Sequence, residues 1–364
     1  MLRRTSTAGQ PPVFRAAAAA CLGCLVVLSA AQAPARFADR IAVLSEPGGY
    51  FDTDNLVSNE ASYVRVLTEL AQRKVRGGAY IGVGPDQNFT YIGAIRPSIA
   101  FILDIRRDNL LLHLLFKALF ASADTRVGYL SRLCGRPAPS GGIDWKKASI
   151  EQIVAHVDGA RASDQDAAAA RAAVNAAIAR MGVPLSTEDV RTIERFHRRF
   201  MDAGLGLRFQ STGRPARSYY PTYRDLLLAR DASGAGSFLA SEETFQFLKG
   251  LHQKDLIVPV VGDVSGPKAV AAIARMLAER GERLSAFYVS NVEFYLFGDG
   301  RFSRYLENLT RVPHVPNAVL IRSAFGPYAS GTGTDYSSSH VQSLDELLLR
   351  ARKGEILRYT DLLH

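Results

Sequence analysis

The sequence predicts an α/β protein with a doubly wound, mostly parallel sheet. The first observation is the stretch 77–107, GGAYIGVGPDQNFTYIGAIRPSIAFILDIRR, which indicates a strand, a glycine turn, a helix, a second strand and a final acidic residue. The second is the stretch 256–321, where three apolar strands alternate with two helices. Such alternation is typical of parallel strands joined by crossover helices that cover both faces of a sheet.

The first 33 residues have the layout of a secretory signal peptide, so we expect export to the periplasm or cell envelope. Three early arginines precede an uncharged, mostly apolar run at 16–31, and Ala31-Gln32-Ala33 is a small-x-small cleavage pattern. A single domain is then expected over residues 34–364. The alternatives are a retained anchor, a lipoprotein acylated at Cys21 or Cys24, and a cytoplasmic protein with an alanine-rich start.

Composition and charge limit which partners, metals and disulfides are expected. Without residues 1–33, which carry three arginines and no acid, the net charge falls from +9 to +6. This mildly basic balance does not indicate nucleic-acid binding, and membrane association is expected only through the N-terminal segment. Only Cys134 remains in the expected mature chain, which rules out an internal disulfide there, and no Cys/His cluster has zinc spacing, so no metal is expected.

A polar, turn-rich loop at 45–60, SEPGGYFDTDNLVSNE, comes before the first strand. The apolar spacing that follows, from Tyr63 to Leu70, predicts a helix that ends before Gly77-Gly78. We expect the loop to close over a site at the sheet edge. Its candidate substrate-contacting residues are Glu46, Asp54, Asn55, Asn59 and Glu60.

The glycine turn and the acidic residue after the second strand form the strongest motif. The strand 79–81 runs into Gly82-Val83-Gly84, and the strand 99–103 ends at Asp104, 20 residues after Gly84. Glycines allow close backbone approach to a ligand, and a carboxylate at the next strand tip can accept hydrogen bonds from a ribose diol. The alternative is an ordinary turn between strand and helix. The candidate cofactor-binding residues are Gly82, Gly84, Asp86, Asn88, Asp104, Arg106 and Asp263.

Residues 110–120 predict a buried helix in which His113 is more simply a core residue than a catalyst. Residues 122–255 then predict a large helical insertion between the second and third strands. Its expected helices are 165–181, one that begins at a capping box at Ser186 and runs to Ala203, and 242–252, capped by Ser241. The Arg- and Tyr-rich loop 208–224 could bind a phosphate or stack on a base. The simpler alternative is a solvated loop whose tyrosines pack on the core.

The second half predicts strands at 256–261, 284–289 and 318–321, with helices at 267–280 and 302–309 between them. The Gly- and Ser-rich tail 326–339 is expected to be mobile or a rim loop, and no final antiparallel strand is evident. Polar residues follow each of the first four strands, and in a parallel sheet those tips line one crevice. Asn291 and Glu293, after the fourth strand, are the candidate catalytic residues.

The Gly82-Val83-Gly84 turn, Asp104, Asp263 and the Asn291/Glu293 pair together resemble the class I S-adenosylmethionine-dependent methyltransferases. The resemblance covers residues 77–107 and 256–322. It implies a Rossmann-like, methyltransferase-like fold, S-adenosylmethionine as cofactor, Asp104 at the ribose and Asp263 near the adenine. Asn291 and Glu293 would meet the methyl acceptor. The sequence departs from the family pattern at Tyr80, where an acidic residue is usual, and at Pro85-Asp86.

The segments SEPGGYFDTDNLVSNE, YIGVGPDQNFTYI and FILDIRRDNLLLHLLFKALF more narrowly resemble an uncharacterised family of exported or lipoprotein-like bacterial proteins. That resemblance implies no activity. The sequence therefore leaves two main readings: a methyltransferase of unknown acceptor, and an exported, non-catalytic protein that binds a nucleotide or small molecule in the same crevice. An NAD-dependent oxidoreductase is a third, disfavoured by the missing third glycine of GxGxxG.

Overall fold

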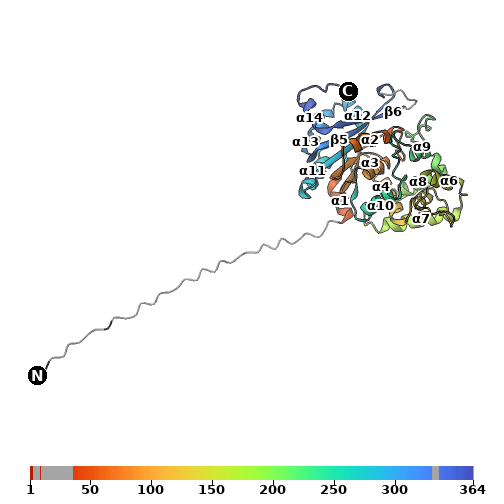
Figure 1. Cartoon of the computed structure of the whole chain (residues 1–364), viewed down its shortest axis with the longest axis horizontal. Coiled ribbons are helices and arrows are strands. Elements are labelled where there is room, and N and C mark those ends of the chain that lie inside the picture. Colours follow the sequence, from red (N-terminus) through yellow and green to blue (C-terminus); the bar gives the residue numbers. More distant parts are fainter. Residues whose placement is uncertain (3–8, 10–35, 330–335, 364) are drawn as a thin grey trace. The chain divides into compact units, whose positions relative to one another are not determined.

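The computed structural model describes residues 1, 2, 9, 36–329 and 336–363, and Figure 1 shows how their elements are arranged. The expected signal peptide, residues 1–33, lies outside the described residues apart from Met1, Leu2 and Gly9. In the described part of the chain, no helix combines the length and the hydropathy needed to span a membrane.

A six-stranded, mostly parallel sheet forms the centre of the unit Arg36–His364. The strands are β1 (Ala79–Gly82), β2 (Ile99–Asp104), β3 (Ile257–Val261), β4 (Leu284–Ser290), β5 (His314–Phe325) and β6 (Ser337–Ser343). They lie in the order β3-β2-β1-β4-β5-β6, and only β6 runs antiparallel to its neighbour. The expected mixed α/β class with a mostly parallel sheet is therefore confirmed. The carboxyl ends of β1 to β4 meet at one edge, where the strand order reverses between β1 and β4.

Helices cover both sides of the sheet, which explains why β1, β2 and β3 are almost uninterrupted buried apolar runs. Helices α3 (Gln87–Ile95) and α4 (Arg107–Ser122) pack against α10 (Glu242–Gln253), whereas α11 (Ala269–Glu279) packs against α1 (Phe37–Leu44) and α13 (Phe302–Arg311). Outside the insertion the helices are α1 (Phe37–Leu44), α2 (Leu67–Gln72), α3 (Gln87–Ile95), α4 (Arg107–Ser122), α11 (Ala269–Glu279), α12 (Val292–Gly298), α13 (Phe302–Arg311) and α14 (Leu344–Arg352). Short 3-10 turns are η1 (Tyr63–Val66), η2 (Gly204–Gly206), η3 (Gly326–Tyr328) and η4 (Tyr359–Leu362).

The helical insertion between β2 and β3 is confirmed. Its helices are α5 (Arg126–Leu133), α6 (Ile150–Gly159), α7 (Asp164–Ala179), α8 (Thr187–Ala203), α9 (Tyr223–Leu228) and α10 (Glu242–Gln253). The Ser186 capping box and the Ser241 cap both form as the sequence predicts. Helix α4 is buried because α5, α7, α8 and α10 pack around it. Figure 1 shows α6, α7 and α8 grouped away from α11 and α13.

Two local predictions are corrected by the structure. The expected helix from Tyr63 begins as the 3-10 turn η1 and becomes α-helical only at Leu67. The serine-rich tail does contain a final antiparallel strand, because β6 pairs with β5 from Val319↔Ser343 to Phe325↔Ser337. An edge strand needs only one backbone partner, so tertiary contact overrides the low strand propensity of this polar segment.

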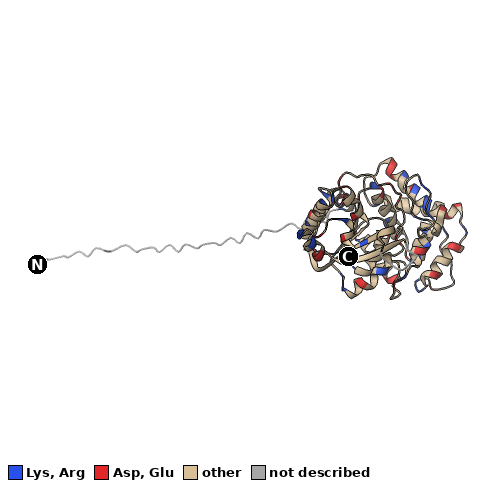
Figure 2. Cartoon of the chain, turned by 90° about the horizontal axis from the view of Figure 1, so that it is seen from above, with Lys and Arg blue, Asp and Glu red and all other residues tan. Residues whose placement is uncertain are grey.

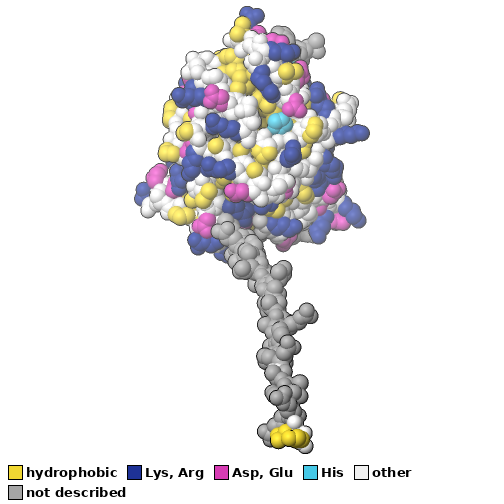
Figure 3. Space-filling view, turned by 90° about the vertical axis from the view of Figure 1, so that its left-hand side faces the viewer, with side chains coloured by type: hydrophobic (Ala, Val, Ile, Leu, Met, Phe, Trp, Pro, Cys, Tyr) yellow, Lys and Arg dark blue, Asp and Glu magenta, His cyan; other side chains and the backbone are white. Residues whose placement is uncertain are grey.

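Positions occupied by Lys or Arg and positions occupied by Asp or Glu are interspersed along the helices that surround the sheet (Figure 2). The space-filling face in Figure 3 likewise mixes basic, acidic and apolar side chains. This mixed surface fits the mild net charge expected from the sequence.

Candidate ligand-binding pocket

A pocket lies at the carboxyl edge of the sheet, where open α/β sheets bind their ligands. Its walls are the segments that follow β1, β2, β3 and β4, and residues from 51–60 together with Phe209 close it from the other side. Counted out to its open mouth, the pocket holds about 970 Å³ of space. This figure includes open solvent, and the room available to the centre of a water-sized molecule is about 170 Å³.

The structure brings part of the predicted site together and leaves part outside the pocket. The predicted residues that line it are Asn55, Asn59, Glu60, Gly84, Asp104, Arg106, Asp263 and Asn291. The predicted residues that do not line it are Glu46, Asp54, Gly82, Asp86, Asn88 and Glu293. Each of the second group has contacts that explain its position.

Gly82 and Asn88 shape the glycine turn from within. A Cβ on Gly82 would lie 1.9 Å from Asn88 Oδ1, so no side chain fits there. The Asn88 amide donates hydrogen bonds to the carbonyls of Val83 (2.8 Å) and Pro85 (2.7 Å). Gly84 has a φ of +81°, a conformation that glycine adopts without strain. The turn thus presents Gly84 to the pocket on a backbone fixed by Asn88.

His113 supports the same turn from α4. Its ring Nε2 lies 2.9 Å from the Gly84 carbonyl oxygen, and the side chain is buried. Burial lowers the pKa of His113 to about 4, so the ring is neutral at physiological pH. His113 does not line the pocket, which fits the expectation of a core residue rather than a catalyst.

Asp104 and Arg106 form a charged pair at the tip of β2. The Asp104 carboxylate accepts a hydrogen bond from the Arg106 backbone N–H at 2.9 Å and lies 3.3 Å from its guanidinium. The same guanidinium donates to the carbonyl of Thr53 at 3.0 Å. Arg106 therefore connects the loop 51–60 to the end of β2. The carboxylate oxygens of Asp104 can still accept hydrogen bonds from a ligand in the pocket.

Asp263 and Glu46 fix the turn that follows β3. Asp263 Oδ1 accepts hydrogen bonds from the backbone and hydroxyl of Ser265, and its Oδ2 pairs with Arg301. Glu46 accepts from the backbone N–H groups of Asp263 and Lys268, each at 2.9 Å, just before α11 begins. Glu46 thus holds the wall in place from behind, and Asp263 faces the pocket.

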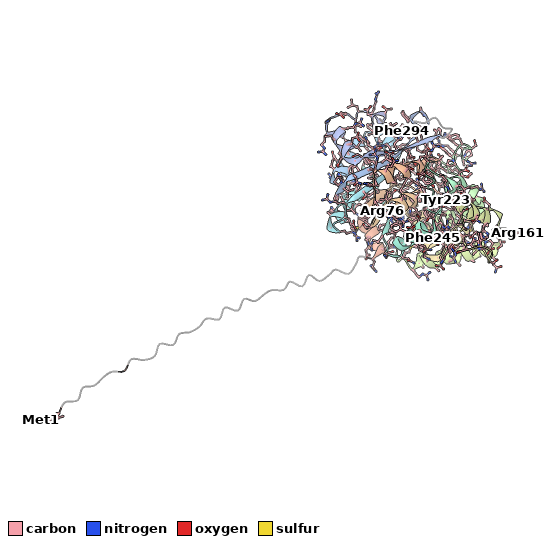
Figure 4. The ribbon with its side chains drawn as sticks, viewed as in Figure 1. Met1, Arg76, Arg161, Tyr223, Phe245 and Phe294 are labelled. Carbon is pink, nitrogen blue, oxygen red and sulfur yellow. The ribbon has the colours of Figure 1, made fainter. Side chains whose placement is uncertain are left out.

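Asp86 and Asp54 connect the site to the helical insertion. Tyr223 of α9, labelled in Figure 4, donates its hydroxyl to Asp86 at 2.6 Å, and both side chains are buried. Burial raises the pKa of Asp86 to about 7. Asp54 Oδ2 lies 3.3 Å from Arg199, and burial also raises the pKa of Asp54. For the loop 208–224 we expected tyrosines packed on the core. Tyr223 is buried in this way, whereas Tyr219 is half exposed.

Glu60 has the most unusual surroundings in the pocket. Its side chain is only 1% exposed, yet its carboxylate accepts hydrogen bonds from neutral hydroxyls alone: Tyr288 (2.6 Å), Ser323 (2.5 Å) and Ser290. Among the described residues, no Lys, Arg or His forms an ion pair with it. Burial raises the pKa of Glu60, and the three hydroxyl donors oppose that rise.

Asn291 and Glu293 are separated by the start of α12. Asn291 lines the pocket, but Glu293 turns into the core, where its carboxylate pairs with Arg322 at 2.6 and 3.1 Å. Arg322 also donates to Gln342 of β6 and to the Leu362 carbonyl, so further hydrogen bonds hold the buried pair in place. The neighbouring Phe294 is exposed at 41% and is labelled in Figure 4.

Sequence reasoning missed several lining residues. Gln87, the first residue of α3, and Ser290, the last residue of β4, directly adjoin predicted site residues, and their polar side chains were the available signal. Phe51 and Tyr295 meet edge to face at the rim, with ring centroids 4.9 Å apart. Their pairing joins segments more than 200 residues apart, for which a single sequence carries no signal.

Most of the residues that line the pocket belong to the part of the chain that matches a family model. No match to a curated protein was found. A family model covers residues 56–360, which include β1 to β6 and most of the pocket lining. The chain therefore belongs to the family described as Domain of unknown function (DUF7790).

Proposed function

We propose that the pocket binds an adenosine-containing ligand, with S-adenosylmethionine as the first candidate and methyl transfer to an unknown acceptor as the reaction. The observation that carries this proposal is that the glycine turn at Gly84 and the Asp104 carboxylate line one pocket at adjacent strand tips. The strand order, with a reversal beside β1 and an antiparallel final strand, supports a Rossmann-like, methyltransferase-like assignment.

The lining residues suit the parts of such a ligand. Asp104 offers carboxylate oxygens to the ribose hydroxyls, and the glycine turn lets the backbone approach the centre of the ligand. On the β3 side, Asp263 offers an acceptor to the amino group of an adenine. Ile105 and Val264, which also line the pocket, supply apolar surface for the base.

The transfer itself would need little covalent help from the protein. The bond between sulfur and the methyl carbon breaks as a bond from an oxygen or nitrogen nucleophile to that carbon forms, and the acceptor loses a proton to water. Positioning and exclusion of water are the main contributions of such a site. Asn291 lines the pocket and would orient an acceptor, whereas Glu293 is held in an ion pair with Arg322 outside the pocket lining.

Calorimetry of the full chain with S-adenosylmethionine, S-adenosylhomocysteine and NAD tests the proposal. We expect the first two to bind and Asp104→Asn to weaken their binding roughly 10- to 100-fold, because hydrogen bonds to a charged acceptor are lost. Asp108→Asn is the matched control, since Asp108 is exposed on α4, and it should leave affinity unchanged. Absence of binding by all three ligands at millimolar concentration would refute the proposal.

A non-catalytic binding protein that uses the same pocket is the second candidate. The observation that favours it is the ion pair between Glu293 and Arg322, because Glu293 is then not available to take a proton from a methyl acceptor. Export through residues 1–33 remains a prediction, and it would also favour this reading, since an exported protein is separated from cytoplasmic cofactor. Binding of S-adenosylmethionine without any release of S-adenosylhomocysteine in the presence of candidate acceptors would select it.

A further inference from the structure

We infer that the Glu60 end of the pocket binds a primary ammonium group of the ligand, such as the amino group of an amino-acid moiety. The inference rests on the proposed binding of an adenosine-containing ligand and deepens it, because it assigns a chemical class to the part of the ligand beyond the nucleoside.

The first support is the charge balance around Glu60. Three hydroxyl groups orient its carboxylate, but they bring no positive charge, and a buried carboxylate without a cation is costly. Glu60 lines the pocket, so a cation that enters there can supply the missing charge. A ligand ammonium group would also donate to the one acceptor position of the carboxylate that the three hydroxyls leave open.

The second support is a buried acceptor beside it. Gln87 is 6% exposed and lines the pocket, and its side-chain Oε1 has no hydrogen-bond partner among the described residues. Its Nε2 donates to the Tyr288 hydroxyl at 2.9 Å, and that hydroxyl donates to Glu60. Gln87 and Glu60 are therefore within two hydrogen bonds of each other. An acceptor without a donor, beside a carboxylate without a counter-charge, calls for a cationic group rich in N–H donors.

The position of Glu60 along the sheet fits a ligand with a nucleoside at one end and an ammonium group at the other. Asp104 and Asp263 follow β2 and β3, whereas the hydroxyls around Glu60 come from β4 and β5, with β1 and its glycine turn between them. At about 4.8 Å between strands, the two ends of the pocket are separated by roughly 10 to 14 Å. A nucleoside at the β2–β3 end would therefore extend past Gly84 and bring a further side chain to Glu60.

Three ligands and one substitution test the inference. S-adenosylmethionine carries a sulfonium and an ammonium, S-adenosylhomocysteine carries the ammonium alone, and methylthioadenosine carries neither. Calorimetry with full-chain Glu60→Gln should show roughly 10- to 100-fold weaker binding of the first two ligands and about unchanged binding of methylthioadenosine. Glu307→Gln, an identical change at an exposed position of α13, should alter none of the three affinities.

Each other outcome has a defined meaning. If wild-type protein binds none of the ligands, the proposed function itself fails. If Glu60→Gln weakens all three equally, or none, the ammonium inference fails while the binding proposal stands. A loss confined to S-adenosylmethionine would show that Glu60 contacts the sulfonium and would also overturn the inference.

A second variant keeps the test decisive if Glu60→Gln does not fold. Gln87→Met removes the open acceptor and leaves the Glu60 carboxylate in place. We expect it to weaken the two ammonium-bearing ligands roughly 3- to 10-fold, the scale of one neutral hydrogen bond, and to spare methylthioadenosine. Equal affinity of Gln87→Met and wild type for S-adenosylhomocysteine would contradict the inference.

Discussion

The regions around Glu60 and Glu293 show how differently two buried glutamates can be used at the same end of one sheet. Each side chain is 1% exposed. Glu293 is neutralised by Arg322 and sealed in the core, whereas Glu60 is held by hydroxyls and faces the pocket. Burial therefore does not by itself mark a functional carboxylate. We infer a role only for Glu60, because it both lines the pocket and lacks a counter-charge.

Breaking the Glu293 pair should have the largest effect. Glu293→Gln leaves Arg322 buried without its counter-charge, so we expect a loss of about 3 to 5 kcal/mol in the free energy of unfolding, measured by urea titration at neutral pH. The double variant Glu293→Leu/Arg322→Met should recover part of that loss, since it removes both charges. A double variant no more stable than Glu293→Gln would argue against a charge-based explanation.

Asp86 extends the comparison, since it too is buried with a hydroxyl partner, Tyr223. Its folded-state pKa of about 7 lies above the ordinary aspartate value of 3.8, so the folded protein holds an extra proton between these values. Stability from this group is therefore full at low pH and falls as pH rises through the window. The raised pKa of Glu60 contributes in the same direction.

Asp86→Asn should remove the Asp86 part of this dependence. We expect the stability of the variant relative to wild type to rise by about 2 to 3 kcal/mol between about pH 4.5 and about pH 6.5. Urea titrations at several pH values measure this difference. Asp202→Asn, an exposed change on α8, should give a difference that does not vary with pH. A constant difference for Asp86→Asn as well would show that Asp86 titrates normally.

The smallest expected effect tests whether the hydroxyl donors stabilise the Glu60 carboxylate. Ser323→Ala removes one of the three hydroxyl donors and should cost about 1 kcal/mol of stability at neutral pH, the usual net value of one hydrogen bond. It should also raise the pKa of Glu60 further, since that donor favours the charged form. Ser303→Ala, exposed on α13, is the control. Thermal unfolding without any difference between the two variants would mean that the Ser323 hydroxyl does not stabilise the carboxylate.

The sequence alone determined the elements whose signals are local. Apolar runs placed β1 to β4 within about a residue, and the Ser186 and Ser241 caps placed the starts of α8 and α10. The predicted strand ends also placed Gly84, Asp104 and Asp263 at one edge of the sheet, because parallel strands have their carboxyl ends together.

Only the tertiary structure decided the partners of the polar side chains. Glu60 meets Tyr288 and Ser323 across 228 and 263 positions, and Glu293 meets Arg322 across 29. The polar strand β6 likewise depends on its pairing with β5. Strand and helix propensities act over a few neighbouring residues, whereas burial, ion pairing and pocket lining depend on which distant segments the fold places side by side.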